Sequence, residues 1–308
     1  MKLNLNQTFT EIVKEEICFN LIKKELPKEV VILSFLKNNA EYNLIDNSIE
    51  FTTKYVPIIQ LFKNFVEAHS TYKMDILISD TKTLKDQKNN YKIKLNLGND
   101  FLNKISIDHL SSFNDENELK NILLGAFLSG GSVNNPKKSS YHFEIRSFNE
   151  EFKNLIYVTL VKFGFSPKEI FYKNKWIIYF KKSSDISDLL KILGANNSMF
   201  CLEDNRIERD MFNNLQRLIN LEVFNLNKTT KAAVEQFKMC EIISTSVYYD
   251  TLSEKEKDYC DTRLKNPRAS MQQICNIMST TFSDKYHNLT KGSLCHIVNK
   301  IKTIYKKI

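Results

Sequence analysis

Within residues 29–193 the order of predicted secondary-structure elements occurs twice. Each copy begins with an apolar helix and continues with stretches of alternating polarity and a second helix. The opening helices are predicted at 29–40 and 117–129, and the equivalent stretches Phe35–Asn39 and Phe127–Gly131 lie 92 residues apart (127 minus 35). Strands are predicted at 42–46, 48–52, 72–79, 91–97, 140–147, 169–172 and 176–180, and further helices at 8–24, 54–69, 149–163 and 184–193. An internal duplication of this kind predicts two similar half-domains that share an interface.

The helix predicted at 117–129 combines an apolar stripe with two small residues, Gly125 and Ala126. A small residue on a helix face lets another backbone approach closely. Gly130-Gly131 is expected to end the helix in the left-handed conformation. The segment Leu123–Gly131 resembles the LAGLIDADG motif, the helix that forms the domain interface of homing endonucleases. The alternative is an ordinary buried core helix that ends at a glycine cap.

The predicted strand 140–147 has a polar and an apolar face. The alternation assigns Tyr141, Phe143 and Ile145 to one face and His142, Glu144 and Arg146 to the other. An open, basic sheet face would suit the backbone of a nucleic-acid duplex, whereas a solvated face with no partner would show the same alternation.

From about residue 230 the sequence predicts helices only. Capping-box patterns open two of them, at Thr251–Glu254 and at Ser270–Gln273, and Asn266-Pro267 ends the first. Thr290 is expected to cap a third helix at 291–306, whose apolar stripe comprises Leu294, Val298, Ile301 and Tyr305. A short helix, a connector and a longer basic helix are typical of a helix-turn-helix, although this connector is long for one.

The net charge of +8 is concentrated at the C-terminal end. Residues 228–308 contain 14 Lys and Arg and 8 Asp and Glu, a net of +6. Ser293, His296, Lys300, Thr303 and Lys307 recur at helical spacing on the side opposite the apolar stripe. This distribution is compatible with a polyanionic partner, and a solvated lysine face is the alternative.

Three stretches together resemble the WhiA family of bacterial DNA-binding regulators. They are Leu124–Pro136 followed by Tyr141–Ile145, Ile186–Asn196 with Arg206-Ile207, and Arg217–Thr229 with Ala232-Ala233. The resemblance implies an α+β fold with two LAGLIDADG homing-endonuclease-like half-domains, followed by an all-α helix-turn-helix domain. It also implies DNA binding and transcription regulation, linked to cell division and chromosome segregation and, in some relatives, to sporulation.

The same resemblance implies the residues that contact DNA. On the recognition helix they are Lys291, Ser293, His296, Asn299 and Lys300. A secondary surface for DNA or a partner would include His142, Arg146, Arg217, Asn220, Asn227 and Lys228. Ile297 and Asn299 stand where relatives often have Arg, which would remove two potential bidentate base contacts.

The sequence favours a binding protein over an enzyme. LAGLIDADG endonucleases hold their metal ions with one acid at the end of each interface helix, and Asn38 and Gly130 stand at those positions here. The six cysteines form no C-x-x-C pair, so neither zinc nor disulfides are expected, and no cofactor is predicted. No apolar signal or membrane-spanning stretch is visible, which favours a cytoplasmic, nucleoid-associated protein without a membrane partner.

The predicted organisation has four parts. They are a first half-domain at 1–110, a second at 111–208, a linker helix at 209–229 and the DNA-binding domain at 230–308. The expected partner is double-stranded DNA in promoter regions, with proteins of the transcription or division machinery as further candidates. The alternatives are a scaffold or ligand-sensing protein that uses the LAGLIDADG-like domain and, less favoured, an RNA-binding protein, because no aromatic residues are interleaved with the basic ones.

Overall fold

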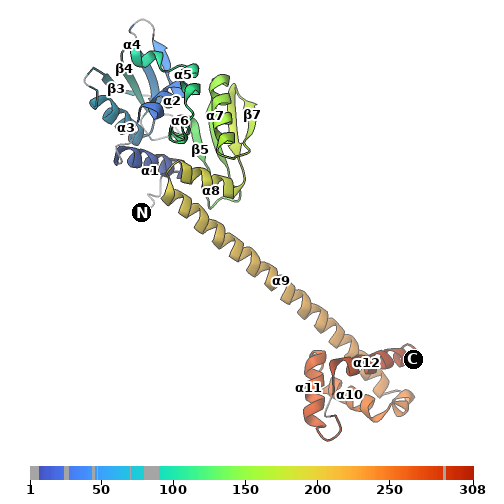
Figure 1. Ribbon diagram of the computed structural model, residues 1–308. Helices are drawn as coiled ribbons and strands as arrows, with labels where there is room; N and C mark the ends of the chain where they lie inside the picture. Colours follow the sequence, from blue (N-terminus) through green and yellow to red (C-terminus); the bar gives the residue numbers. More distant parts are fainter. Residues whose placement is uncertain are drawn as a thin grey trace. The chain divides into compact units, whose positions relative to one another are not determined.

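The computed structural model describes residues 7–23, 28–43, 46, 48–69, 71–79, 90–286 and 289–308 of the chain. It consists of two compact units, Met1–Arg209 and Asp210–Ile308, whose elements are labelled in Figure 1. Each unit has its own buried apolar cluster.

The N-terminal unit contains two half-domains with the same sheet topology. After α1 (Phe9–Lys23), the first half comprises α2 (Glu29–Asn39), β1 (Glu41–Asn43), β2 (Ser48–Thr53), α3 (Val56–Glu67), β3 (Lys73–Ser79), β4 (Asn90–Asn96), α4 (Asn99–Asn103) and α5 (Ile107–Ser112). The second half comprises α6 (Glu116–Gly130), β5 (Gly131–Val133), β6 (Phe143–Ser147), α7 (Glu150–Lys162), β7 (Lys168–Tyr172), β8 (Lys175–Phe180) and α8 (Ser183–Ile192). The antiparallel sheets have the orders β1-β2-β4-β3 and β5-β6-β8-β7. The identical order confirms the duplication inferred from the sequence.

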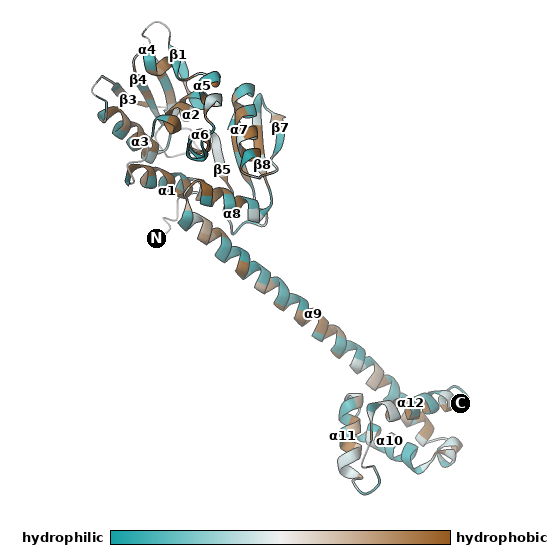
Figure 2. Cartoon of the chain, in the orientation of Figure 1, coloured by the Kyte–Doolittle hydropathy of each residue, from teal (hydrophilic) through white to brown (hydrophobic). Residues whose placement is uncertain are grey.

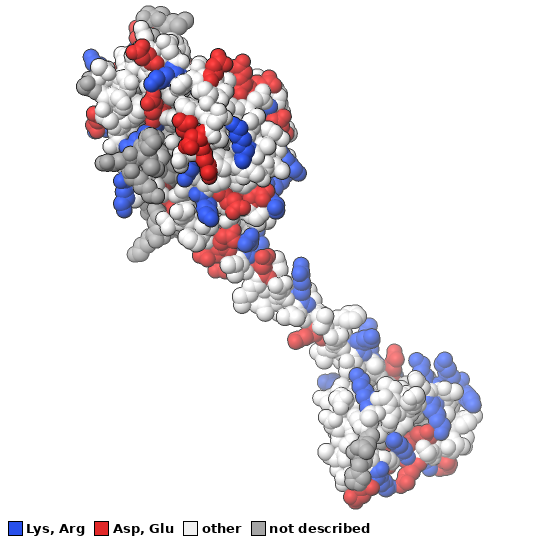
Figure 3. Space-filling view, viewed as in Figure 1, with Lys and Arg blue, Asp and Glu red and all other residues white. Residues whose placement is uncertain are grey.

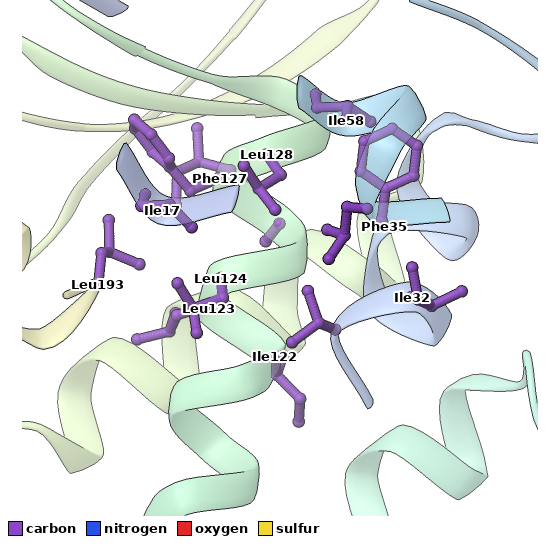
Figure 4. Close-up of a cluster of buried hydrophobic side chains, with 14 of the residues drawn as sticks. Ile17, Ile32, Phe35, Ile58, Ile122, Leu123, Leu124, Phe127, Leu128 and Leu193 are labelled. Atoms are coloured by element: carbon purple, nitrogen blue, oxygen red, sulfur yellow. The ribbon is translucent and has the colours of Figure 1, made fainter. Parts of the chain in front are cut away.

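Helices α2 and α6 cross closely at the interface between the halves. A Cβ atom added to Gly125 would overlap Val31 O and lie 2.6 Å from Ser34 Cβ, so only glycine allows this approach. The Ser34 hydroxyl donates a hydrogen bond across the crossing to Ile122 O at 2.7 Å. Figure 4 shows the surrounding cluster, which collects apolar side chains from α1, α2, α3 and α6.

The glycine pair after α6 does not adopt the predicted left-handed cap. Gly131 has φ −77° and ψ 146°, and the chain passes directly from α6 into β5. The glycines are needed for space instead, because a Cβ on Gly131 would overlap Phe127 O and one on Gly130 would overlap Arg146 O. The prediction was wrong because short β5 pairs with β6, a contact that the local sequence does not reveal.

Helix α9 (Asn196–Ser244) is much longer than the linker helix predicted at 209–229. Figure 2 shows hydrophobic residues recurring along it between hydrophilic ones. The boundary between the two units falls inside this helix, after Arg209. Within the described part of the chain, no helix combines the length and apolarity that crossing a bilayer requires.

The C-terminal unit is built around a small helical core. Beyond α9 it contains η1 (Val247–Thr251), α10 (Glu254–Lys265), α11 (Met271–Thr281) and α12 (Lys291–Tyr305). The capping box predicted at Ser270 and Gln273 is present. The one predicted at Thr251–Glu254 is wrong by two residues, because Ser253 caps α10 and pairs with Glu256. Arg263 is completely buried and donates to Gln236 Oε1 at 2.7 Å, which ties α10 to the end of α9.

Candidate nucleic-acid interface

Helix α12 presents one apolar and one polar face. The Thr290 side chain accepts a hydrogen bond from Ser293 N and so caps the helix as predicted. Leu294, Ile297 and Ile301 are buried against α10 and α11. Residues 289–308 contain five lysines and a histidine but no Asp or Glu. The exposed face of α12 therefore carries lysines in its first turn and in its C-terminal half, and no acidic side chain of its own.

Four of the five predicted contact residues on α12 are exposed, namely Lys291, His296, Asn299 and Lys300. Lys291 lies in the first turn, and His296 and Asn299 lie on the outer face. Figure 3 shows Lys and Arg side chains close together on the C-terminal unit, in the region where Figure 1 places α12 and the C-terminus. Lys291, His296 and Asn299 occupy positions from which a helix in a major groove would reach bases or phosphates.

Ser293, which is half-buried, and Lys300, whose side chain is 56% exposed, both contact residues of α10. Lys300 Nζ lies 2.8 Å from Glu256 Oε1, and Ser293 Oγ lies 3.3 Å from Lys255 Nζ. Burial acts to raise the pKa of Glu256, but hydrogen bonds from Lys300 and Ser253 outweigh it and hold that pKa below its usual value. Glu256 is therefore a firmly ionised partner of Lys300, and that lysine is less available to DNA than its position in the sequence indicated.

Position 297 is a core position and not a lost base contact. Ile297 is 8% exposed and belongs to the apolar cluster of the C-terminal unit. The predicted apolar stripe included Val298 and Tyr305, but Val298 is only partly buried and Tyr305 is 38% exposed. The buried stripe of α12 is rotated by part of a turn relative to the predicted one, because the sequence of the helix does not reveal which elements pack against it.

Sequence reasoning missed three residues on the exposed face, namely Cys295, Lys302 and Lys306. Lys302 and Lys306 follow the exposed Asn299 at intervals of three and seven residues, the spacing of one helix face. No acidic side chain lies within 4 Å of Lys302 or Lys306 among the described residues. Continuing the helical spacing from Asn299 would have found both lysines.

The predicted secondary surface is divided between two units. Arg217, Asn220, Asn227 and Lys228 are all exposed and share one side of α9. His142 and Arg146 lie in the N-terminal unit, on or beside β6. The structure thus groups four of the six residues on one helix face and places the other two elsewhere.

The outer face of the second sheet is not the basic platform that strand alternation suggested. Glu144 accepts from Arg146 Nε at 2.9 Å and lies 3.1 Å from His142 Nε2. One largely buried carboxylate therefore faces both predicted contact residues. On the first sheet, Lys92 pairs with Glu50 at 2.8 Å and Lys94 with Asp46 at 2.7 Å.

The ends of α2 and α6, where an endonuclease would carry its acids, meet through an amide. Asn38 Nδ2 donates to Ser129 Oγ at 2.8 Å and to Arg146 O at 3.0 Å. At Gly130 any side chain would overlap the Arg146 carbonyl and lie 2.9 Å from Asn38 Nδ2. Among the described residues, no group of three His, Cys, Asp or Glu side chains is placed to hold a metal ion.

Together these features define a class of protein: a degenerate LAGLIDADG-like unit joined to a helix-turn-helix module. The WhiA LAGLIDADG-like domain matches residues 119–212, and the WhiA C-terminal HTH domain matches residues 215–305. The chain belongs to the WhiA family, since full-length relatives match it at about 30% identity along nearly all of their length.

Two relatives named "Probable cell division protein WhiA" illustrate the match. The protein of Exiguobacterium sibiricum is 30% identical over 313 residues, covering 97% of this chain and 96% of its own. That of Pediococcus pentosaceus is 31% identical over 317 residues, covering 97% and 98%. The crystal structure of full-length DUF199/WhiA from Thermotoga maritima superposes with a TM-score of 0.60 at 23% identity, covering 98% of this chain and 99% of that one, which supports the fold.

Proposed function

We propose that this protein is a non-catalytic regulator of transcription that binds double-stranded DNA through α12 and acts in cell division. The observation that carries the proposal is the composition of the exposed face of α12. Lys291, His296, Asn299, Lys302 and Lys306 are exposed, and the helix contains no acid of its own. A capped N-terminus with a lysine in the first turn suits a phosphate, and the residues that follow suit base edges.

The direct test is titration of the full chain with duplex DNA from promoter regions at several salt concentrations. Replacing Lys291, Lys302 and Lys306 by Ala should weaken binding at least about tenfold and reduce the log–log salt slope by about 0.9 for each lysine that contacts a phosphate. Lys63→Ala, at an exposed lysine of α3, is the matched control and should leave both quantities unchanged. An unaltered salt slope in the triple variant would exclude α12 as the DNA surface.

The proposal also states that the LAGLIDADG-like unit does not cleave DNA. With Asn38 and Gly130 at the helix ends, neither position supplies an anionic ligand for a metal ion. Supercoiled plasmid incubated with the protein and Mg²⁺ or Mn²⁺ should remain intact. Gly130→Asp should not restore cleavage, because the new side chain would overlap the Arg146 carbonyl. Nicking that depends on the protein would contradict this part of the proposal.

A further inference from the structure

A cavity of about 690 Å³ opens in the N-terminal unit at the ends of α2 and α6. The basic side chains among its lining residues are Lys14, Lys138, Arg146 and Lys175, and the described residues contribute no Asp or Glu to the lining. Its size is that of a typical small-molecule site. We name it the helix-end pocket.

Lys14, from α1, is buried in the wall of the helix-end pocket. It is 3% exposed, and its Nζ donates to Leu128 O at 2.9 Å. The same atom lies 4.7 Å from the centre of the Tyr55 ring. No carboxylate of the described residues lies within 4 Å of Nζ, so the buried amine has no counter-ion. Burial lowers its pKa to about 7, and the nearby Arg146 adds to the lowering.

A buried amine without a counter-ion costs free energy unless an anion approaches it. The two other lysines of the pocket also lack acidic partners. Within the described part of the chain, neither Lys138 nor Lys175 has a carboxylate within 4 Å, and Lys175 Nζ instead lies 4.7 Å from the Phe148 ring centre. Counting carboxylates of the described residues alone, Arg146 is the one paired cation of the four, and its partner Glu144 lies outside the pocket lining.

An uncharged polar residue of the lining, Asn38, is incompletely satisfied. Its Nδ2 donates twice, but its Oδ1 is buried and has no hydrogen-bond partner among the described residues. Unpaired buried acceptors are rare in native structures and call for a donor. A ligand that carries a hydroxyl or N–H beside its anionic group would supply one.

The surroundings of the pocket favour a small anion over a DNA duplex. A duplex lying across the two sheets would meet lysines that already face Glu50 and Asp46, and an arginine that faces Glu144. A compact anion inside the pocket would meet mainly unpaired cations. Phosphate groups are the anions that clustered lysines and an arginine commonly bind.

We propose that the helix-end pocket binds a small phosphorylated molecule of nucleotide size, so that the LAGLIDADG-like unit is a ligand-sensing module. Lys14, Lys138 and Lys175 would contact the phosphate, and Asn38 Oδ1 would accept from a hydroxyl or N–H of the same ligand. This inference is independent of DNA binding by α12, because all pocket residues belong to the N-terminal unit.

The test is calorimetric titration of the full chain with pyrophosphate and with ATP at millimolar concentration in a phosphate-free buffer. Binding of either probe is expected, and the double variant Lys138→Ala/Lys175→Ala should weaken it at least about tenfold because two charge-assisted contacts are lost. Both lysines are at least partly exposed, so the fold should be retained. Lys168→Ala, at an exposed lysine of β7 outside the pocket, is the control and should bind like the wild type.

Three outcomes would overturn the proposal. One is that neither pyrophosphate nor ATP gives a heat of binding. Another is binding that the double variant and the Lys168→Ala control share equally, since such binding would lie outside the pocket. The third is that the pocket binds DNA instead of a small molecule. The double variant would then lose affinity for duplex DNA, and the wild type would bind neither pyrophosphate nor ATP. Lys14→Met, with its fold checked by circular dichroism, should also abolish probe binding.

Discussion

The outer face of the second sheet and the exposed face of α12 both carry basic residues that were predicted to contact DNA, but their electrostatic surroundings differ. On the sheet, Arg146 and His142 share Glu144. Lys291 and Lys302 on α12, and Lys306 directly after it, lie on a segment without acids, and among the described residues Lys300 alone of these lysines reaches a carboxylate, from α10. A basic face becomes an anion-binding surface only when neighbouring elements leave its charges unpaired.

The largest expected effect distinguishes the stability of the N-terminal unit from DNA binding by the C-terminal unit. Gly125→Val should destabilise the N-terminal unit by roughly 3 kcal/mol or more, because the new side chain would overlap Val31 O at the crossing of α2 and α6. DNA affinity should survive, since α12 packs within the other unit. Thermal unfolding followed by circular dichroism measures the first effect, and DNA titration measures the second. Loss of DNA affinity together with the N-terminal unit would show that α12 is not sufficient.

The next effect concerns Lys14, the buried cation without a counter-ion. Its pKa is about 7 in the folded protein and 10.5 in the unfolded chain, so between these values the unfolded chain holds a proton that the folded one lacks. The free energy of unfolding should therefore rise with pH across this window, and the contribution is lost as pH falls through 7. Chemical denaturation in phosphate-free buffers would measure this slope, and in Lys14→Met it should be absent. An identical slope in wild type and variant would refute the assignment.

A matched pair of substitutions compares the two faces directly. Lys302→Ala should lower DNA affinity several-fold and reduce the salt slope by about 0.9, because it removes one unpaired cation. Arg146→Ala should change neither, since its charge is already opposed by Glu144. Fluorescence anisotropy at several salt concentrations measures both. A larger loss of DNA affinity in Arg146→Ala than in Lys302→Ala would indicate that DNA binds to the sheet.

The smallest expected effect on DNA affinity tests the ion pair between Lys300 and Glu256. Glu256→Gln removes the carboxylate that holds Lys300 but keeps an oxygen able to accept from Ser253 N. The released lysine should increase DNA affinity by about two- to threefold and steepen the salt slope by up to about 0.9. The same titrations would detect it. Unchanged affinity would mean that Lys300 lies outside the DNA contact even when it is free.

The sequence predicted what depends on local patterns. The duplicated order of elements, the capping box at Ser270 and the closely packed Gly125 all follow from residues near one another in the chain. It did not predict contacts between distant residues. Lys300 meets Glu256 from 44 positions away, and Gly130 meets the carbonyl of a strand that begins 13 residues later. The polar face of α12 was misjudged by part of a turn for the same reason, because α10 and α11 determine which residues are buried.

The crowding at Gly130 also bears on the history of the fold. A catalytic acid needs room for its side chain as well as a suitable codon, and here a main-chain carbonyl and the Asn38 amide occupy that room. Reversion by a single substitution would cost packing energy before it restored any chemistry, so selection would oppose the first step. An acidic side chain could therefore enter this position only together with a displacement of the Arg146 carbonyl or of the Asn38 amide.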